Sequence, residues 1–338
     1  MLLEGEGAGE TGETGPDDDD FGLGGHARQG MRPASSSPVE IEHHRGGTMG
    51  RVQDVPTAEV PMEVRIEFAH AALQHLADQE GVDLVHIKGI AFEPRWRSRA
   101  SGGSDADVLV RPSQVERFVS AVEATGWRRR SRFRTGSPFG HAQTYWHDHL
   151  GYADVHRFFP GTRPDETAFD VLWARRQRRE LAAVACPVPD EAGQALIFAL
   201  NEARNGATVR TQPRLAELVD DPRLGGEVVA LVPQVGAEVG WAAALDELDR
   251  VRGHREHDLW HAVARDGSRV AEWRARVKAQ PTVLGKVGLV VRAPMVNTEH
   301  LANTRGHEPT AWEVAVEFLD RGRRAGLELW RARPGGAR

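Results

Sequence analysis

The sequence lacks the features that mark secreted, fibrous and membrane-spanning proteins. Its 338 residues include one cysteine, Cys186, so the chain cannot close a disulfide bond with itself. No stretch approaches the roughly 18 consecutive apolar residues that a membrane-spanning helix needs. The first ten residues, MLLEGEGAGE, have neither the basic start nor the apolar core of a secretory signal. We therefore expect a cytoplasmic protein that does not bind a membrane.

The negative charge of the chain is concentrated at its N-terminus. Residues 1–48 hold ten acidic and three basic residues, which gives that segment a net charge of −7. Since the whole chain has a net charge of −6, the remaining residues carry +1. A nearly neutral body does not attract a large polyanion, which disfavours nucleic acid as a partner. The same segment is rich in Gly, Asp, Glu, Ser and Pro, and we predict a disordered acidic tail over residues 1–55. Met49 is an alternative start of the protein.

The remaining chain is long enough for two domains at roughly 150 residues each. Residues 62–81 have helical spacing, with Val64, Phe68, Ala71, Ala72 and Leu76 as the expected apolar face. Strands are predicted at 82–89, 105–110, 127–133, 142–147 and 151–159, and a helix at 112–125. Helical patterns follow, beginning with one at 169–181. The prediction is an α+β fold, with a mixed sheet and flanking helices over residues 61–165 and a mostly helical domain over 166–332.

The segment Asp105-Ala106-Asp107-Val108-Leu109-Val110 carries the clearest chemical signal. In a strand, successive side chains alternate between faces, so Asp105 and Asp107 project to one side about 6 to 7 Å apart. Two carboxylates at this separation repel each other unless a cation lies between them, and Mg²⁺ prefers oxygen ligands. The pattern therefore predicts a site for Mg²⁺ or Mn²⁺.

Two other segments extend this site. In Tyr152-Ala153-Asp154-Val155-His156, alternation places Asp154 and His156 on one face, so that Asp154 becomes a candidate third ligand. Three carboxylates on adjacent strands suit two metal ions that bridge the phosphates of a nucleoside triphosphate. Lys88 and Gly89 end a strand ahead of a short helix, where a cation and free N–H groups meet a phosphate.

In this order, the motifs resemble uncharacterised bacterial nucleotidyltransferases of the polymerase-beta-like superfamily. The similarity covers about residues 65–230, and these families often occur beside biosynthetic gene clusters. It implies that Asp105, Asp107 and Asp154 are the catalytic metal ligands. The nucleotide-binding residues that it implies are Lys88, Gly89, Gly103, Ser104, Arg99 and His156.

The chain departs from the family pattern at two positions. An arginine usually stands four residues before the first metal aspartate, where this chain has Ser101, and the nearest arginines are Arg99 and Arg97. The Gly102-Gly103-Ser104 loop resembles the glycine-serine phosphate loop of other members. Downstream, the segments LIFALNEARN and RLAELVDDP resemble the helices that close over the nucleotide, but Asn201 stands where a histidine is common.

The expected activity is Mg²⁺-dependent transfer of a nucleoside monophosphate, for example from ATP, to a hydroxyl of a small molecule or peptide. One alternative is a non-catalytic protein of the same fold that binds nucleotides or peptides. Another is a toxin-like enzyme that modifies tRNA. Each residue also has a structural explanation when taken alone: Asp105 as a turn cap, Lys88 as a surface cation, and His156 as a sheet histidine bonded to the backbone.

Overall fold

The computed structural model describes residues 60–99, 103–133, 139–264, 269–280, 282–292, 301, 307 and 309–331. The chain divides into two units, Met1–Val60 and Pro61–Arg338, and every element below belongs to the second. The acidic tail predicted over residues 1–55 lies outside the described residues. The border predicted between residues 165 and 166 stays a prediction. In the part of the chain that is described, no helix combines the length and the hydropathy needed to cross a bilayer.

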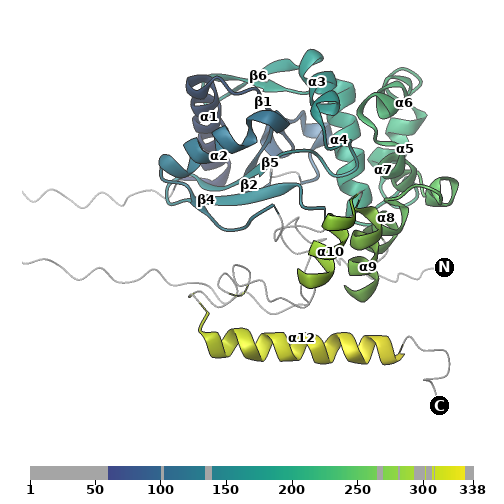
Figure 1. The fold of residues 1–338 in the computed structure, drawn as a ribbon. Helices are drawn as coiled ribbons and strands as arrows, with labels where there is room; N and C mark the ends of the chain where they lie inside the picture. The colour runs from purple at the N-terminus through teal and green to yellow at the C-terminus, as the bar shows by residue number, and fades with distance from the viewer. Residues whose placement is uncertain are drawn as a thin grey trace, which may run out of the picture. The chain divides into compact units, whose positions relative to one another are not determined.

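The main sheet has five strands in the order β1-β2-β5-β4-β3. Figure 1 labels four of them, β1, β2, β5 and β4. The strands β2 and β5 run parallel, and every other neighbouring pair is antiparallel. The mixed sheet predicted from the sequence is therefore confirmed. Its strands are β1 (Leu84–Ile87), β2 (Asp105–Val110), β3 (Arg128–Arg129), β4 (Ala142–His147) and β5 (Gly151–His156).

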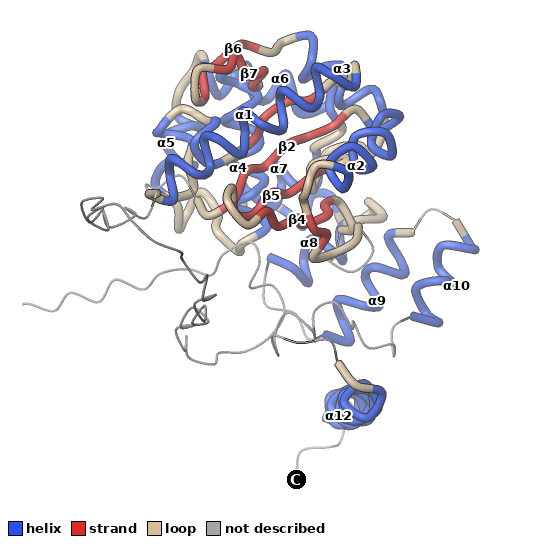
Figure 2. Tube along the Cα trace, turned by 90° about the vertical axis from the view of Figure 1, so that its left-hand side faces the viewer, coloured by secondary structure: helices blue, strands red, loops and turns tan. Residues whose placement is uncertain are grey.

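Apolar side chains cover both faces of this sheet. Ala106, Val108 and Val110 of β2 pack into one cluster with residues of α1 (Met62–Glu80) and α2 (Val115–Ala124), which lie on the same side of the strands (Figure 2). Leu109, from the opposite face of β2, belongs to a second cluster with the helices that follow the sheet. Because side chains alternate along β2, Asp105 and Asp107 lie on the second face.

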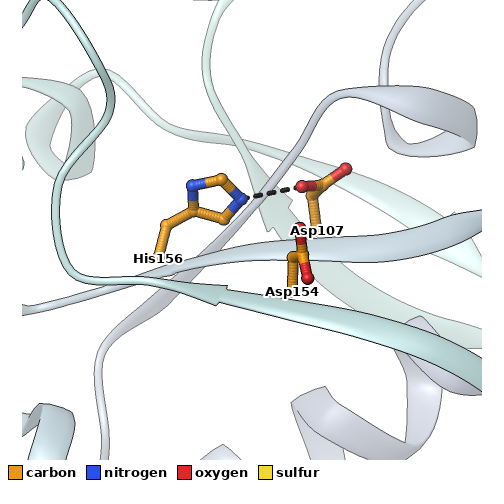
Figure 3. A group of neighbouring side chains, drawn as sticks. All are labelled: Asp107, Asp154 and His156. Carbon is orange, nitrogen blue, oxygen red and sulfur yellow. Dashed lines mark hydrogen bonds and ion pairs between the residues drawn. The ribbon is translucent and has the colours of Figure 1, made fainter. Parts of the chain in front are cut away.

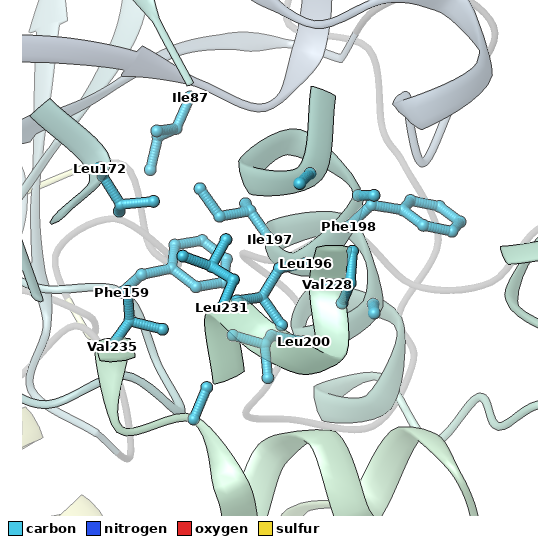
Figure 4. Packing of buried hydrophobic residues seen from close by; sticks show 14 of the residues in the cluster. Ile87, Phe159, Leu172, Leu196, Ile197, Phe198, Leu200, Val228, Leu231 and Val235 are labelled. Carbon is cyan, nitrogen blue, oxygen red and sulfur yellow. The ribbon is translucent and has the colours of Figure 1, made fainter. Parts of the chain in front are cut away.

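A helical region follows the sheet, as predicted. Its helices are α3 (Glu166–Ala174), α4 (Glu191–Arg204), α5 (Pro213–Asp220), α6 (Leu224–Val235), α7 (Glu238–Ala244), α8 (His257–Ala264), α9 (Arg269–Ala279), α10 (Val283–Arg292) and α12 (Ala311–Arg331). The helix α4 is buried along nearly its whole length, and its Leu196, Ile197 and Leu200 pack in one cluster with residues of α6 (Figure 4). A Cβ atom on Gly240 of α7 would overlap Leu200, so the close approach of α7 to α4 requires glycine there.

The helix predicted over 169–181 is wrong in its second half. The helix α3 ends at Ala174, and the chain then forms a hairpin of β6 (Gln177–Leu181) and β7 (Val184–Val188). The turn residues Ala182 and Ala183 have φ values of 46° and 64°. Two-residue hairpin turns with positive φ usually contain Asn or Gly, so this alanine pair gives no turn signal in the sequence.

The helix predicted near residue 62 is confirmed, but part of the predicted apolar face is wrong. Phe68 is 53% exposed and Val64 is also exposed. The buried face instead includes Ile66, Leu73 and the polar residues His70 and Gln74. A pattern of apolar residues alone missed this face because two of its members are polar.

These two polar residues belong to a buried hydrogen-bonded chain. The His86 Nε2 lies 3.0 Å from the Gln74 Oε1, which can only accept, so this nitrogen donates. The His86 Nδ1 must then accept from the His70 Nδ1, 2.8 Å away. A proton added to His86 Nδ1 would face the N–H of His70 Nδ1, or would force the His70 proton onto its Nε2, which is buried with no hydrogen-bond partner among the described residues. Burial lowers the pKa of His70 to about 3, and burial together with the neighbouring His70 lowers the pKa of His86 well below its ordinary value.

This pair predicts a loss of stability in mild acid. Below the unfolded-state pKa of about 6.5, the unfolded chain binds protons that the folded chain does not. The free energy of unfolding should therefore fall as the pH decreases from 6.5 toward 3, by roughly 4 kcal/mol between pH 7 and pH 5 for two such histidines. Urea unfolding at a series of pH values measures this slope.

The double variant His70→Asn/His86→Asn should be less stable at pH 7 but should lose less stability on acidification. A matched control is His75→Gln, at an exposed position of the same helix, which should keep the wild-type slope. A double variant with the wild-type slope would contradict the assignment.

Candidate active site

Two acidic residues meet in one row of the main sheet. The strand register pairs Ile87 of β1 with Asp107 of β2, Asp107 with Asp154 of β5, and Asp154 with Thr144 of β4. Residues paired across neighbouring strands have side chains on the same face. The predicted pairing of Asp154 with the Asp-x-Asp strand is therefore confirmed, with Asp107 as its direct neighbour.

Asp107, Asp154 and His156 form a compact group. Each offers one ligand atom, and these three atoms all lie within 4.8 Å of one another. All three side chains are buried. The His156 Nε2 lies 2.7 Å from the Asp107 Oδ1, and the Asp154 carboxylate also points toward Asp107 (Figure 3). His156 thus bonds to a carboxylate of the site, unlike the backbone-bonded histidine of the structural alternative.

Lys88 supplies a positive charge to this group. Its Nζ lies 2.8 Å from the Asp107 Oδ1, and its side chain is only 12% exposed, so it is not a surface cation. The backbone at Lys88 has φ = 60° and ψ = −174°, a conformation that a non-glycine residue rarely adopts. Such a conformation costs about 1–3 kcal/mol. The residue in this strained turn thus brings its ammonium group to Asp107.

The other predicted residues lie around this group. Asp105 begins β2 on the same face as Asp107, but it is not a member of the three-residue group. Its Oδ1 lies 3.7 Å from the position that a Cβ on Gly103 would occupy, so its carboxylate leans toward the preceding loop. Ser104 is in that loop, and Gly89 opens the short helix after Lys88.

The loop that contains Arg99 is described only in part. Arg99 lies in a half-buried bend, and Ser101 and Gly102 lie outside the described residues. Arg97, the other arginine near the expected position, donates from Nε to the carbonyl of Phe92 at 3.1 Å. Its second donation goes to the carbonyl of Ile90. Arg97 therefore holds the backbone of the short helices before the loop.

Two carboxylates and an imidazole nitrogen at this separation fit a divalent cation. Mg²⁺ and Mn²⁺ favour carboxylate oxygen, and imidazole is a ligand for several divalent metals. Burial makes two adjacent negative charges costly, and a divalent ion offsets that cost better than one ammonium group does.

A second polar layer supports the group, and the sequence analysis did not assign it. The ring of His141 lies 5.0 Å from the ring of His156, centroid to centroid. The Arg204 guanidinium, at the end of α4, lies 3.2 Å from the His141 Nε2 and also donates to Asn201. Asn201 in turn donates to Ser98 at 3.2 Å. The available signal was Arg204 at the end of the apolar segment that forms α4. An arginine buried there needs specific hydrogen-bond partners.

Cys186 has no part in this chemistry. Its thiol is buried in β7, and burial raises its pKa to about 12. A thiol with so high a pKa is a poor nucleophile at neutral pH.

The strain at Lys88 can be separated from its charge by two substitutions. Lys88→Gly and Lys88→Met both remove the ammonium group and leave the buried carboxylates without it, so both should be less stable than wild type. Glycine adopts φ = 60° without steric cost, so Lys88→Gly should be about 1 kcal/mol more stable than Lys88→Met. Urea unfolding measures the difference. A Lys88→Met variant equal to or more stable than Lys88→Gly would contradict the strained turn.

Comparison with known proteins gives only distant likenesses. No family model matches the chain, and no curated protein matches it. It is similar to the lincomycin-bound crystal structure of the lincosamide antibiotic adenylyltransferase LnuA, at 12% identity and a TM-score of 0.28, over 38% of this chain and 82% of that one. It is also similar to an antigenic nucleotidyltransferase-like protein from Paracoccidioides brasiliensis, at 10% identity and a TM-score of 0.29, over 59% and 92% of the two chains. At these scores we infer neither fold nor function from them.

Proposed function

We propose that this protein is a nucleotidyltransferase that uses Mg²⁺ or Mn²⁺ to move a nucleoside monophosphate from a nucleoside triphosphate to an acceptor hydroxyl. The observation that supports this proposal is the buried pair Asp107 and Asp154, side by side on parallel strands, with His156 and Lys88 in contact with Asp107. Paired carboxylates with an adjacent cation suit phosphoryl chemistry, in which catalysis is mostly positioning and charge stabilisation.

Each residue has a role in this proposal. Asp107 and Asp154 would hold the divalent cation, with Asp105 as a further carboxylate at the start of β2. The bond between His156 and Asp107 orients that carboxylate. A bound divalent cation would neutralise phosphate charge and acidify the acceptor hydroxyl. Lys88 adds a positive charge that would face the phosphates, and Gly89 next to it carries no side chain that would obstruct their approach.

The reaction is a substitution at phosphorus. The acceptor oxygen forms a bond to the α-phosphorus, the bond from that phosphorus to the bridging oxygen breaks, pyrophosphate leaves, and the hydroxyl proton passes to water. Negative charge accumulates on the transferred group and on the leaving pyrophosphate. The ammonium group of Lys88 stabilises that negative charge.

A small molecule or peptide is the acceptor class that we favour. Residues 49–338 carry a net charge of only +1. An enzyme that holds a long polyanion gains its affinity from neutralised phosphates, which requires many more basic than acidic residues near the site. The cytoplasm supplies both nucleoside triphosphates and magnesium, and we propose that the protein acts there, in a biosynthetic pathway.

Labelled triphosphates test the activity. The full chain, incubated with each of four α-labelled nucleoside triphosphates, Mg²⁺ or Mn²⁺, and a cell extract, should transfer label to a metabolite or peptide and release pyrophosphate. Asp107→Asn and Asp154→Asn should each reduce transfer on the order of 10²-fold or more, because each removes charge that the transition state needs. The control Asp220→Asn, at an exposed position in α5, should retain wild-type activity.

The labelling assay and a calorimetric binding measurement together distinguish the alternatives. Calorimetric binding of triphosphate without pyrophosphate release would favour a non-catalytic nucleotide-binding protein. Label on added tRNA would favour an RNA-modifying enzyme. Transfer at the wild-type rate by Asp107→Asn would refute the proposed site.

Metal binding can be measured without the reaction. Mn²⁺ titrated into the full chain and followed by electron paramagnetic resonance should bind in the wild type and in Asp220→Asn. In Asp154→Asn, which removes a ligand, we expect affinity to fall by about tenfold or more. Equal affinity in Asp154→Asn and the wild type would place the metal elsewhere.

A further inference from the structure

The helix α12 presents a broad apolar surface to solvent. Trp312 is 74% exposed and Leu319 is 70% exposed, and Val316, Phe318, Leu327 and Trp330 are also exposed. At 100° per residue, Trp312, Val316, Leu319, Leu327 and Trp330 fall within about 80° of one another around the helix. Exposed apolar patches of this kind mark interaction sites. Thr310 and Glu313 form a capping box at the start of the helix, with 2.7 Å between the Thr310 N and the Glu313 Oε2.

The charges of this helix are divided between its two halves. In sequence, residues 311–320 contain Glu313, Glu317 and Asp320 and no basic residue. Residues 321–331 contain four arginines, at 321, 323, 324 and 331, and one acid, Glu328. The halves therefore carry −3 and +3, and the helix as a whole is neutral. A neutral helix has no electrostatic attraction to an anionic membrane.

This division fits an antiparallel pair of identical helices. A two-fold axis near residues 321 and 322 would place the acidic half of each helix beside the basic half of the other. The same axis would place Trp312 opposite Trp330 of a second copy, and Asp320 opposite Gly322 of that copy, next to its Arg323. Arg323 interrupts the apolar stripe, and this symmetry gives it an acidic neighbour. A two-fold interface requires this kind of self-complementary surface.

Two glycines lie at one edge of the apolar stripe: at 100° per residue, Gly326 falls about 20° from Leu319 and Gly322 about 60° from it. Gly322 and Gly326 are one turn apart, and a Cβ built on either meets no atom of the described residues within 4 Å. Glycine inside an exposed helix is destabilising, and no contact within the described part of the chain requires either one. Small residues one turn apart allow two helix backbones to approach closely.

From these observations we propose that α12 is a homodimerisation helix, in which two copies of the chain pair their α12 helices antiparallel through the Trp312–Trp330 face. The occupant of the exposed face is thus α12 of a second copy. This inference does not depend on the proposed enzymatic activity.

Charge reversal in one half at a time gives a complementation test. Variant A, Glu317→Arg/Asp320→Arg, makes both halves positive, and variant B, Arg323→Glu/Arg324→Glu, makes both halves negative. Each alone should dissociate at a concentration about tenfold or more above that of the wild type, because like charges then face each other. An equimolar mixture of A and B should form a 1:1 heterodimer, since the halves of A and B are complementary. Sedimentation velocity of the full chains, with one variant fluorescently labelled, measures both results.

Three further variants complete the design. Leu319→Glu should weaken self-association, and the control Val229→Glu, at an exposed position in α6, should not. Gly326→Ala should raise the helix content seen by circular dichroism but weaken the dimer, because Gly326 lies next to Leu319 at the edge of the apolar stripe. A wild-type chain that stays monomeric up to about 100 μM would overturn the proposal. So would failure of the mixture of A and B to associate while each variant keeps wild-type helix content.

Discussion

The parallel pairing of β2 with β5 is the constraint on which the rest of the site depends. It sets Asp107 beside Asp154 on a face that also packs against the helical region. A slip of one residue in this register would turn one of the two carboxylates to the opposite face, because side chains alternate along a strand. The apolar alternation of Ala106, Val108 and Val110 against α1 and α2 opposes that slip. The six residues of β2, Asp105–Val110, therefore specify both the packing of the core against α1 and α2 and the position of Asp107 in the site.

Two buried carboxylates with oxygens within 4.8 Å of each other are costly, and the surrounding structure offsets that cost. Lys88 brings an ammonium group to Asp107 at the expense of a strained backbone, and His156 contributes a second contact to the same oxygen. Behind His156, the layer of His141, Arg204 and Asn201 connects the sheet to α4 and to the loop at Ser98. The strained backbone at Lys88 lowers the stability of the fold but places its ammonium group against Asp107. Backbone strain of this kind is common at functional sites.

The chemistry of the sheet was more predictable from sequence than the packing of its helices. Alternation in a strand has a fixed period, so the common face of Asp105 and Asp107, and of Asp154 and His156, followed from spacing alone. Asp105 nevertheless stands outside the compact group, because the direction of its side chain depends on the loop before β2. The buried face of α1 was partly misassigned because His70 and Gln74 are polar yet buried. The hairpin of β6 and β7 was missed because two alanines, with no intrinsic turn preference, form its turn. The partners of Arg204 come from distant parts of the chain, which no local pattern indicates.

The most direct test of the central claim is anomalous diffraction from crystals of the full chain soaked in Mn²⁺. The account predicts a manganese peak within coordination distance, about 2.1–2.3 Å, of carboxylate oxygens from both Asp107 and Asp154. A fully occupied peak elsewhere on the chain, with the contact between Lys88 and Asp107 unchanged, would contradict it.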